Sequence, residues 1–406
     1  METKKGAYLF FCANVVMYLA ANFAHPVTPT LFKSLGLGDY MFGYAFAAMM
    51  TVNFFFSPFW GKINSFISSK YSMVIACAGY AVSQFFFGIA RTELHVIGAR
   101  MLAGVFTSGT FVSAVNYVIN TSSDSDRGTY LTVIATLQSV ASAFGFFIGG
   151  MLGERSVQLA IMSQAVCLLV CAVLFAMLMK NDARVPLSSL KLKTLVREAN
   201  PFSAFLAGRQ FMSFLLITFF SVCALQQVAQ IAFDQSFNYY LRDQFGFSSG
   251  YNGVIKAVMG FVTLAANSTV CIYLMKRTDV RKSIIYVFAL SAVAMTGVVV
   301  AGRIVPFILM NILFYGLSAI AIPMMQSMAA SASKGGDSNL IMSFYNALRS
   351  LGGIIGALLA GSLYTLNPKF PFVCALISCA AATMCAMLYY AKSSTASAVA
   401  QSSPTV

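Results

Sequence analysis

Charged side chains are scarce in this chain of 406 residues, because Asp, Glu, Lys and Arg together account for only 9% of it. A soluble domain carries about 25% charged residues, which help to hydrate its surface. Hydrophobic residues reach 59%, so the polar side chains are too few to cover a water-facing surface. The composition therefore excludes an ordinary soluble protein and indicates an integral membrane protein.

Residues that usually carry catalytic or metal-binding chemistry are few or unsuitably spaced. The chain has two histidines and nine cysteines, and every cysteine lies in an apolar stretch without a CxxC pair. This pattern argues against a disulfide framework or a metal site. The sequence also lacks the Gly-x-x-x-x-Gly-Lys-Ser/Thr loop that binds nucleotide phosphates. We therefore expect no cofactor, no metal, no use of ATP and no enzymatic activity.

The chain has instead many long stretches without a charged residue. A helix that crosses a hydrocarbon core about 30 Å thick needs roughly 20 apolar residues. Twelve stretches of 19 or more residues lack Asp, Glu, Lys and Arg, and they cover 6–32, 40–61, 71–90, 101–123, 128–153, 156–179, 210–233, 257–275, 283–302, 304–333, 350–368 and 370–391. The sequence therefore predicts an all-α membrane protein with twelve transmembrane helices.

Positive charge is distributed unevenly between the two sides that twelve spans would create. With the N-terminus in the cytoplasm, the inside segments hold seventeen Lys and Arg residues and the outside segments hold six. Cytoplasmic loops carry such an excess, so both termini are predicted to be cytoplasmic and the protein to lie in the cell membrane. The net charge of +14 then reflects contact with anionic lipid, and no nucleic-acid partner is expected.

The two halves of the chain show weak internal similarity. A shift of 210 residues superposes five identical residues: Leu31 on Leu241, Gly36 on Gly246, Gly43 on Gly253, Ala47 on Ala257 and Met49 on Met259. A shift of 207 residues superposes two glycines of the fifth run on two of the eleventh: Gly145 on Gly352 and Gly149 on Gly356. Transporters are often built from such repeats, so we interpret the pattern as a duplication.

The longest polar segment separates the runs into two sets of six. It contains basic Lys191 and Lys193 and ends near Pro201. We predict a six-helix bundle over 1–180, a cytoplasmic linker over 181–209, a second six-helix bundle over 210–392 and a cytoplasmic tail over 393–406. Two bundles of this kind would enclose a central cavity, and we expect the protein to be a monomer.

Three short motifs lie within this plan. Arg100-Met-Leu-Ala-Gly104 is in the fourth run, Gly145-Phe-Phe-Ile-Gly149-Gly150 ends the fifth, and Gly61-Lys-Ile-Asn-Ser-Phe-Ile-Ser-Ser-Lys70 follows the second. Together with the two sets of six helices, they resemble the major facilitator superfamily, and most of all its twelve-helix drug:proton antiporter groups. Those groups usually have Pro where Phe146 stands and Asp where Ser65 stands. The resemblance implies the major facilitator fold. It also implies a conformational role for six positions: Gly61, Ser65, Gly104, Gly145, Gly149 and Gly150.

Asp234 is the one acidic residue that lies deep in a predicted helix. It shares a helical stripe with Gln227, Gln230 and Asn238, and four polar side chains on one face indicate a wet surface. An ionised side chain near the membrane centre costs about 2.5 to 3.5 kcal/mol, so it is kept there for a function or a partner. We predict that Asp234 carries the coupling proton. A static salt bridge, or simple solvation near the helix end, are the alternatives.

Three cations also lie within predicted helices: Arg100, Lys256 and Arg349. One carboxylate cannot neutralise three cations, and the surplus suggests a substrate with an anionic or strongly hydrogen-bond-accepting group. Backbone carbonyls at the glycine-rich helices offer a structural alternative, and Lys256 could instead extend to the membrane interface. His25 titrates near neutral pH and is a second candidate proton carrier, although a hydrogen-bonded histidine at a helix end explains it equally.

Polar side chains also recur on single faces of the first and tenth helices. Asn14, Tyr18 and His25 follow helical spacing in the first, as do Asn311 and Tyr315 in the tenth, and the resemblance implies that helices 1, 4, 7 and 10 line the cavity. The predicted substrate-binding residues are Asn14, Tyr18, Arg100, Gln227, Gln230, Lys256, Asn311, Tyr315, Asn346 and Arg349.

These features together predict a proton-coupled secondary active transporter, which exports small amphipathic organic compounds by alternating access. Its expected partners are a small-molecule substrate, protons and the lipid bilayer. A proton symporter for uptake of an anionic metabolite or a sugar is one alternative, since Phe146 replaces the usual Pro and cations are in surplus. A transport-dead receptor or lipid-handling scaffold is another, since the loop motif has lost its Asp at Ser65.

Overall fold

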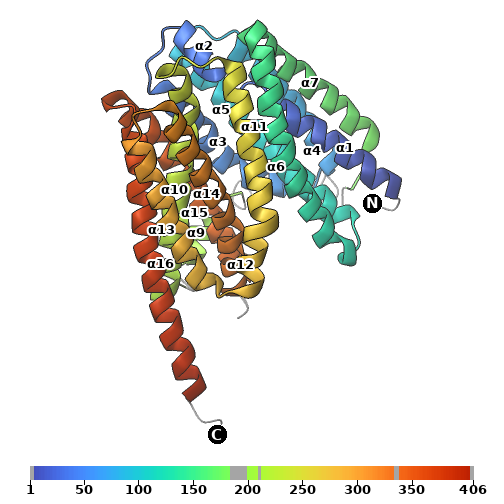
Figure 1. The fold of residues 1–406 in the computed structure, drawn as a ribbon. Coiled ribbons are helices and arrows are strands. Elements are labelled where there is room, and N and C mark those ends of the chain that lie inside the picture. Colours follow the sequence, from blue (N-terminus) through green and yellow to red (C-terminus); the bar gives the residue numbers. More distant parts are fainter. Residues whose placement is uncertain (1–3, 183–198, 209–211, 333–337, 403–406) are drawn as a thin grey trace. The chain divides into compact units, whose positions relative to one another are not determined.

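The computed structural model describes residues 4–182, 199–208, 212–332 and 338–402, and the regular structure in these ranges is helical (Figure 1). The helices in chain order are α1 Lys4–Ala20, α2 Thr28–Ser34, α3 Met41–Ile63, α4 Ser69–Gly88, α5 Glu93–Thr121, α6 Asp124–Arg155, α7 Val157–Leu178, α9 Ser203–Gly208, α10 Phe214–Asp243, α11 Ser249–Ala266, the π-helix η2 Asn267–Cys271, α12 Ile272–Arg277, α13 Val280–Val300, α14 Ile304–Ala332, α15 Ser338–Leu366 and α16 Phe370–Ser402. Most of the predicted linker, with Lys191 and Lys193, lies outside the described residues.

The helices are long and apolar enough to cross a membrane many times. Eleven of the described helical segments meet the length and hydropathy of a membrane span, and Gly6–Ala20 is a shorter apolar helix. Several begin at a capping side chain, because Thr92, Ser123 and Ser156 each accept a hydrogen bond from a backbone N–H in the first turn of the helix that follows. The all-α membrane fold predicted from the sequence is confirmed.

The first predicted span is not one continuous helix. The sequence predicts one span within 6–32 that Pro26 and Pro29 open toward its outer end, and the structure breaks it earlier, since α1 ends at Ala20 and α2 starts at Thr28. Pro26 lies between them, where it lacks an N–H and would clash with the preceding turn of a helix. His25 therefore lies beyond the end of α1, and the prediction that it shares a helix face with Asn14 and Tyr18 is wrong.

The broken backbone between α1 and α2 is held by a side chain of α7. Gln164 is fully buried, its Oε1 accepts from the N–H of Ala24 at 3.0 Å, and its Nε2 donates to the carbonyl of Ala21 at 3.1 Å. The hydroxyl of Tyr80 also donates to Ala21 O at 3.3 Å. Non-helical backbone at membrane depth needs such protein partners because lipid offers none.

The chain folds into two compact units. Unit 1 contains residues 1–201 and 238–261, and unit 2 contains 202–237 and 262–406. The last turn and a half of α10 and most of α11 therefore group with the N-terminal helices, whereas the sequence predicts a single bundle over 210–392. The division into six and six helices stays a prediction.

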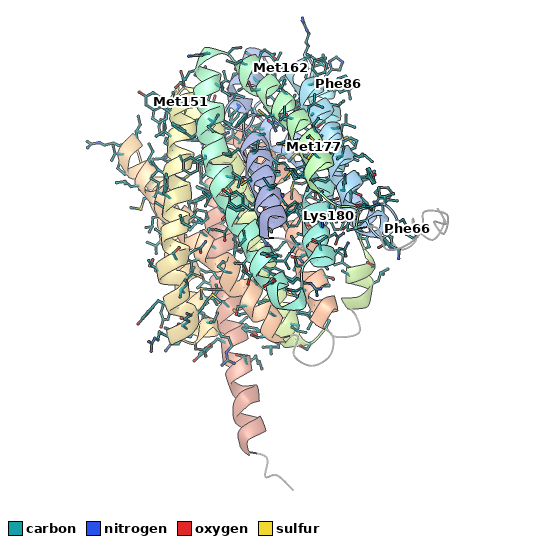
Figure 2. All side chains as sticks on the ribbon, turned by 90° about the vertical axis from the view of Figure 1, so that its right-hand side faces the viewer. Phe66, Phe86, Met151, Met162, Met177 and Lys180 are labelled. Carbon is teal, nitrogen blue, oxygen red and sulfur yellow. The ribbon has the colours of Figure 1, made fainter. Side chains whose placement is uncertain are left out.

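Each unit has an aromatic core and an apolar outer surface. In unit 1, the ring of Phe10 lies 4.8 Å from that of Tyr117. In unit 2, the rings of Phe220 and Phe344 lie 4.5 Å apart. On the outside of unit 1, Figure 2 shows apolar side chains such as Met177, which is 76% exposed. Exposed apolar side chains of this kind are expected where helices face lipid.

Glycines allow the same close backbone contact in both halves. A Cβ added at any of four glycines would meet a backbone carbonyl oxygen of a neighbouring segment, in the pairs Gly145 with Leu19, Gly149 with Phe23, Gly352 with Ala224 and Gly356 with Val228. The first two pairs join α6 to the end of α1 and the turn after it, and the last two join α15 to α10. The four glycines are those that the 207-residue shift superposes, so the contacts support the duplication.

Two further glycines support the duplication through their backbone conformation. Gly36 has φ of 64° and Gly246 has φ of 65°, and they are the positive-φ positions among the described residues. Both follow the end of a helix, and in the first case Leu37 N bonds to Phe32 O at 3.1 Å, as a helix-terminating motif requires. The 210-residue shift superposes these two glycines.

Candidate functional site

Arg100 is buried in unit 1 and is held by neutral groups. It lies on α5 with 5% of its surface exposed. Its Nη2 donates to Thr28 Oγ1 at 3.2 Å, and its guanidinium carbon lies 3.7 Å above the ring centroid of Phe87. Within the described part of the chain it pairs with no carboxylate. The sequence predicts a carboxylate or a backbone carbonyl as the partner of Arg100 and gives no sign of this hydroxyl and ring.

His25 and Lys256 share an aromatic neighbour in the same unit. The His25 ring stacks on Phe146 with centroids 5.3 Å apart and planes at 12°. Lys256 Nζ lies 5.7 Å from the centroid of the same Phe146 ring, and Asn238 Nδ2 donates to His25 O at 2.9 Å. Both Arg100 and Lys256 are close enough to the imidazole to interact with it electrostatically. The structure thus brings two of the predicted cations, Arg100 and Lys256, close to His25, and both His25 and Lys256 contact Phe146, the position that departs from the antiporter motif.

Asn14 and Tyr18 lie in the core of unit 1. Asn14 is fully buried and its Nδ2 donates to Phe10 O at 2.9 Å within α1. Its Oδ1 and the Tyr18 hydroxyl are buried without a hydrogen-bond partner in the described structure. Unsatisfied buried polar atoms call for a ligand, a proton or a change of conformation to explain them.

Unit 2 holds the second group of predicted site residues. Gln230 Nε2 donates to Asp234 Oδ2 at 2.8 Å, and Tyr315 of α14 lies close enough to interact electrostatically with Asp234. Arg349 Nε donates to Gln227 Oε1 at 3.0 Å. The stripe predicted on α10 is therefore a real polar surface with partners on α14 and α15.

Two other predicted residues differ in their surroundings. Asn311 is fully buried, and its Nδ2 donates to Phe307 O at 2.6 Å in its own helix while Oδ1 has no partner in the described structure. Asn346 is exposed, and its backbone carbonyl accepts a hydrogen bond from Ser350 at 3.1 Å. Asn346 therefore lies one turn before Arg349 without joining its buried contacts.

The glycines of the conformational motifs fall into two groups. A Cβ at Gly104 would clash with the backbone of Met49 on α3, and one at Gly150 would lie 2.5 Å from Ser249 O. Around Gly61 the nearest atom to an added Cβ is a Val112 methyl at 3.9 Å. Close packing therefore requires glycine at 104 and 150, but not at 61.

A charged cluster that sequence analysis missed lies in unit 1, and we name it the Lys33 cluster. Lys33 Nζ lies 2.7 Å from Asp39 Oδ1 and 2.6 Å from Asp243 Oδ1, and the Tyr239 hydroxyl donates to Asp39 at 2.6 Å. Burial acts to lower the pKa of Lys33, but the hydrogen bonds to Asp243 and Asp39 outweigh it and raise the pKa. The 210-residue shift superposes Lys33 on Asp243. Opposite charges at these equivalent positions are the sequence feature that could have predicted the ion pair.

A carboxylate lies at the start of both α4 and α13. Before α4, Asp182 accepts hydrogen bonds from Ser68 Oγ at 2.6 Å, Ser69 N at 2.7 Å and Asn120 Nδ2 at 3.0 Å. Ser65, where the family usually has Asp, is exposed. The contribution of Asp182 was missed because it lies far away in sequence.

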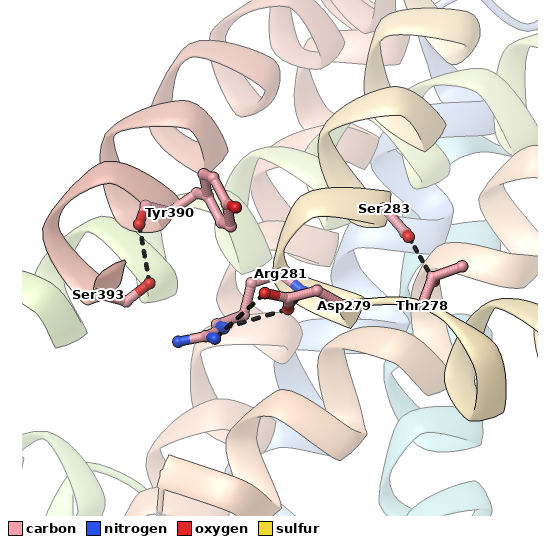
Figure 3. A network of polar contacts seen from close by, with 6 residues as sticks. All are labelled: Thr278, Asp279, Arg281, Ser283, Tyr390 and Ser393. Carbon is pink, nitrogen blue, oxygen red and sulfur yellow. Dashed lines mark hydrogen bonds and ion pairs between the residues drawn. The ribbon is translucent and has the colours of Figure 1, made fainter. Parts of the chain in front are cut away.

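Before α13 the carboxylate is local, as Figure 3 shows. Asp279 Oδ1 accepts from the backbone N–H of Arg281 at 2.9 Å, and the Arg281 guanidinium binds both carboxylate oxygens at 3.2 and 3.1 Å. Burial acts to raise the pKa of Asp279, but these hydrogen bonds outweigh it and the pKa is lowered. Thr278 and Ser283 join their hydroxyls at 2.6 Å in the same loop.

Many membrane-spanning helices that carry buried polar groups are typical of multi-pass membrane transporters. The Major Facilitator Superfamily model matches residues 10–319, and the chain belongs to this family. Multidrug resistance protein 1 of Bacillus subtilis (strain 168) is 22% identical over 389 residues, which cover 94% of this chain and 95% of that protein. Multidrug resistance protein MdtG of Proteus mirabilis (strain HI4320) is 23% identical, with 92% and 93% covered.

Solved structures share the fold across nearly the whole chain. The nucleoside transporter NupG superposes with a TM-score of 0.71 at 12% identity, covering 96% of this chain and 99% of that chain. The human organic anion transporter MFSD10 (TETRAN) superposes with a TM-score of 0.69 at 17% identity, covering 96% and 100%. The fold and family predicted from the sequence are therefore confirmed, and the protein is a multi-pass membrane transporter of a small-molecule substrate.

Proposed function

We propose that the protein is a proton-coupled secondary active transporter that exports small amphipathic organic compounds by alternating access. Support for efflux comes from the two multidrug resistance relatives, whose similarity extends over nearly the whole chain. We also propose that it works as a monomer in the cell membrane, with both termini in the cytoplasm and without nucleic acid. The positive-inside distribution of Lys and Arg supports this orientation.

Proton coupling rests on one observation, the bond between Asp234 and Gln230. Gln230 donates to the carboxylate through Nε2, while its Oε1 is buried without a partner among the described residues. An amide can turn and offer either a donor or an acceptor. Gln230 can therefore bind Asp234 in both its ionised and its protonated state, which suits a carboxyl group that exchanges a proton during each transport cycle.

The test is the variant Asp234→Asn in reconstituted vesicles with an imposed pH gradient. Asparagine keeps the size and the acceptor for Gln230 but carries no titrating proton. We expect a fluorescent rhodamine methyl ester still to bind, while its pH-driven accumulation is lost. Asp279→Asn, which removes an acid at the exposed start of α13, is the matched control and should accumulate the dye normally. If Asp234→Asn still accumulates the dye, Asp234 is not the proton carrier and His25 becomes the candidate.

Two other functions remain to be separated by the same vesicles. Phe146 and the buried cations favour an uptake symporter for an anionic metabolite or sugar, in which proton and substrate move in the same direction. The altered loop at Ser65 favours a receptor or lipid-handling scaffold, which would move neither. Exchange of substrate against protons supports our proposal, movement in the same direction supports the symporter, and no movement supports the scaffold.

A further inference from the structure

Two cationic side chains and a histidine, from separate elements, lie close together in unit 1, and we name this group the His25 site. His25 comes from the α1–α2 connection, Arg100 from α5 and Lys256 from α11, and Phe146 of α6 is the aromatic neighbour of His25 and Lys256. Arg100 and Lys256 each lie seven residues after the first residue of their helix, a rise of about 10 Å. The site is therefore inside the helical region and not in a surface loop.

Arg100 has too little negative charge around it for a buried guanidinium. It is 95% buried, counting from its 5% exposure, and it has five N–H donors. Among the described residues it is held by one hydroxyl, that of Thr28, and one ring, that of Phe87. Thr28 in turn donates its hydroxyl hydrogen to Ala24 O at 2.7 Å. A cation over a ring gains some stabilisation, but a buried charge normally requires an opposite charge.

The acids of α5 and α6 that the structure describes near the helix ends, and those of the Lys33 cluster, are engaged elsewhere. Glu93, the first residue of α5, accepts from the Tyr40 hydroxyl at 2.7 and 2.8 Å. Glu154, near the end of α6, accepts from Gly250 N at 2.6 Å. Asp39 and Asp243 bind Lys33. The acids of the described part of unit 1 therefore do not neutralise Arg100, and a ligand from outside the chain can supply the missing charge.

We propose that the His25 site binds the carboxylate of an amphipathic organic acid, with Arg100 as its main ligand and the Phe146 ring against its apolar part. This inference builds on the proposed function, since it assigns the substrate class of the same transporter. A guanidinium binds carboxylates through two parallel hydrogen bonds. Phe146 adds a flat apolar surface that proline at this position would not provide, which gives the departure from the antiporter motif a chemical meaning.

The experiment compares two dyes that differ in one group, a rhodamine with a free carboxylate and its methyl ester. Binding of each dye to the purified protein is measured by fluorescence anisotropy without a pH gradient. We expect the free acid to bind more tightly, and Arg100→Gln to weaken the acid about tenfold or more, because a charge-assisted hydrogen bond is lost. The ester should change by less than about twofold, because it makes no such bond. Arg303→Gln removes an exposed cation and is the matched control for net charge.

A competition experiment on the unaltered protein covers the case in which Arg100→Gln does not fold. Benzoate should displace the free-acid dye, and benzamide, which has the same ring without the charge, should not. Equal binding of the two dyes with no effect of benzoate would overturn the inference, as would an equal loss of both dyes in folded Arg100→Gln. Neither result bears on proton-driven transport of the ester. The proposed function is therefore tested independently, by Asp234→Asn.

Discussion

The two sequence repeats meet the same structural needs with different partners. Both begin a helix after an equivalent loop, but α13 is capped by its own Asp279, whereas α4 is capped by its own Ser68 together with Asp182 from beyond the end of α7. Each half also holds an arginine on a neutral side chain, although not at equivalent positions: buried Arg100 binds Thr28, and partly buried Arg349 binds Gln227. The two halves therefore share the same kinds of contact, a capped helix start and a neutral partner for an arginine, but they make these contacts with different residues.

The largest difference between the repeats is expected at the glycine contacts. A Cβ at Gly145 would overlap the carbonyl of Leu19, whereas one at the equivalent Gly352 would lie 3.1 Å from Ala224 O. Gly145→Ala should cost about 3 kcal/mol, the upper end for overpacking, because a backbone cannot move aside as a side chain can. Gly352→Ala should be nearly neutral, since the gain in helix propensity of about 1 kcal/mol offsets the tighter contact.

Unfolding of both alanine variants in mixed detergent micelles, followed by circular dichroism, measures this difference. Equal destabilisation of the two would mean that the contacts at α1 and α10 are equally tight. The close approach at Gly145 would then not distinguish the repeats.

The next largest effect is expected at the helix starts. Asp182→Ala leaves Ser69 N and the Asn120 amide without their acceptor and should cost about 2 kcal/mol, the range for hydrogen bonds to a charged group. Asp279→Ala should cost about 1 kcal/mol, as for loss of an N-cap. Thermal unfolding of the detergent-solubilised variants checks the order, and a larger loss at Asp279 would reverse our interpretation.

The pH dependence of the Asp279 contribution follows from its lowered pKa. A carboxyl group whose pKa is lower in the folded state stabilises the protein fully above the unfolded pKa, about 3.9. This stability is lost as the pH falls through the lower folded value. The difference in unfolding between the unaltered protein and Asp279→Ala should therefore be constant near neutral pH and shrink only in strong acid.

A smaller effect is expected in the Lys33 cluster. A double-mutant cycle with Lys33→Gln and Asp243→Asn should give a coupling energy of about 0.5 to 1 kcal/mol, because both side chains are partly exposed. Exchange of the two charges (Lys33→Asp with Asp243→Lys) should restore only part of it, since the new carboxylate would face Asp39. Full restoration would show that Asp39 contributes little to the cluster.

The smallest effect is expected at the loop position that departs most from the family. Ser65→Asp restores the family's carboxylate, but position 65 is exposed and α4 already has Asp182 at its start. We expect a change in unfolding free energy below about 0.5 kcal/mol, as for a surface substitution. Cross-linking that shows a shifted conformational equilibrium in this variant would instead indicate a gating role for the loop.

The sequence predicts the membrane-spanning helices well because each one is recognised from its own residues, as a stretch without charged side chains. Each span is visible as a run without Asp, Glu, Lys or Arg, and the resemblance to the family rests on motifs that can be located by number. Pro26 predicts that the first helix opens but not that α1 ends at Ala20, because the backbone between Ala21 and Ala24 is held by Gln164, a residue 140 positions beyond Ala24. Helix periodicity carries no information about such a distant partner.

The sequence predicts which residues belong to the candidate site, but it does not predict which of them lie close together. Arg100, Lys256 and His25 stand out in the sequence because each is polar within or beside an apolar run. Their proximity depends on how α5, α6, α11 and the α1–α2 connection pack, and Phe146, which contacts His25 and Lys256, resembles only a lost motif residue in the sequence. Asp234 was singled out with Gln230 because they share one helix, where spacing alone predicts contact.

Gln164 shows how a structural role can imitate a functional one in genetic data. Its single amide replaces hydrogen bonds that a continuous helix would have made for Ala21 and Ala24. Leucine, methionine or glutamate at 164 would leave one or both backbone groups unsatisfied in an apolar interior. In a survey of every substitution scored by drug resistance or growth, position 164 should therefore be as intolerant as Asp234, although its role is to hold the backbone. Expression level measured beside activity distinguishes the two kinds of intolerance, because only changes at 164 should deplete the protein itself.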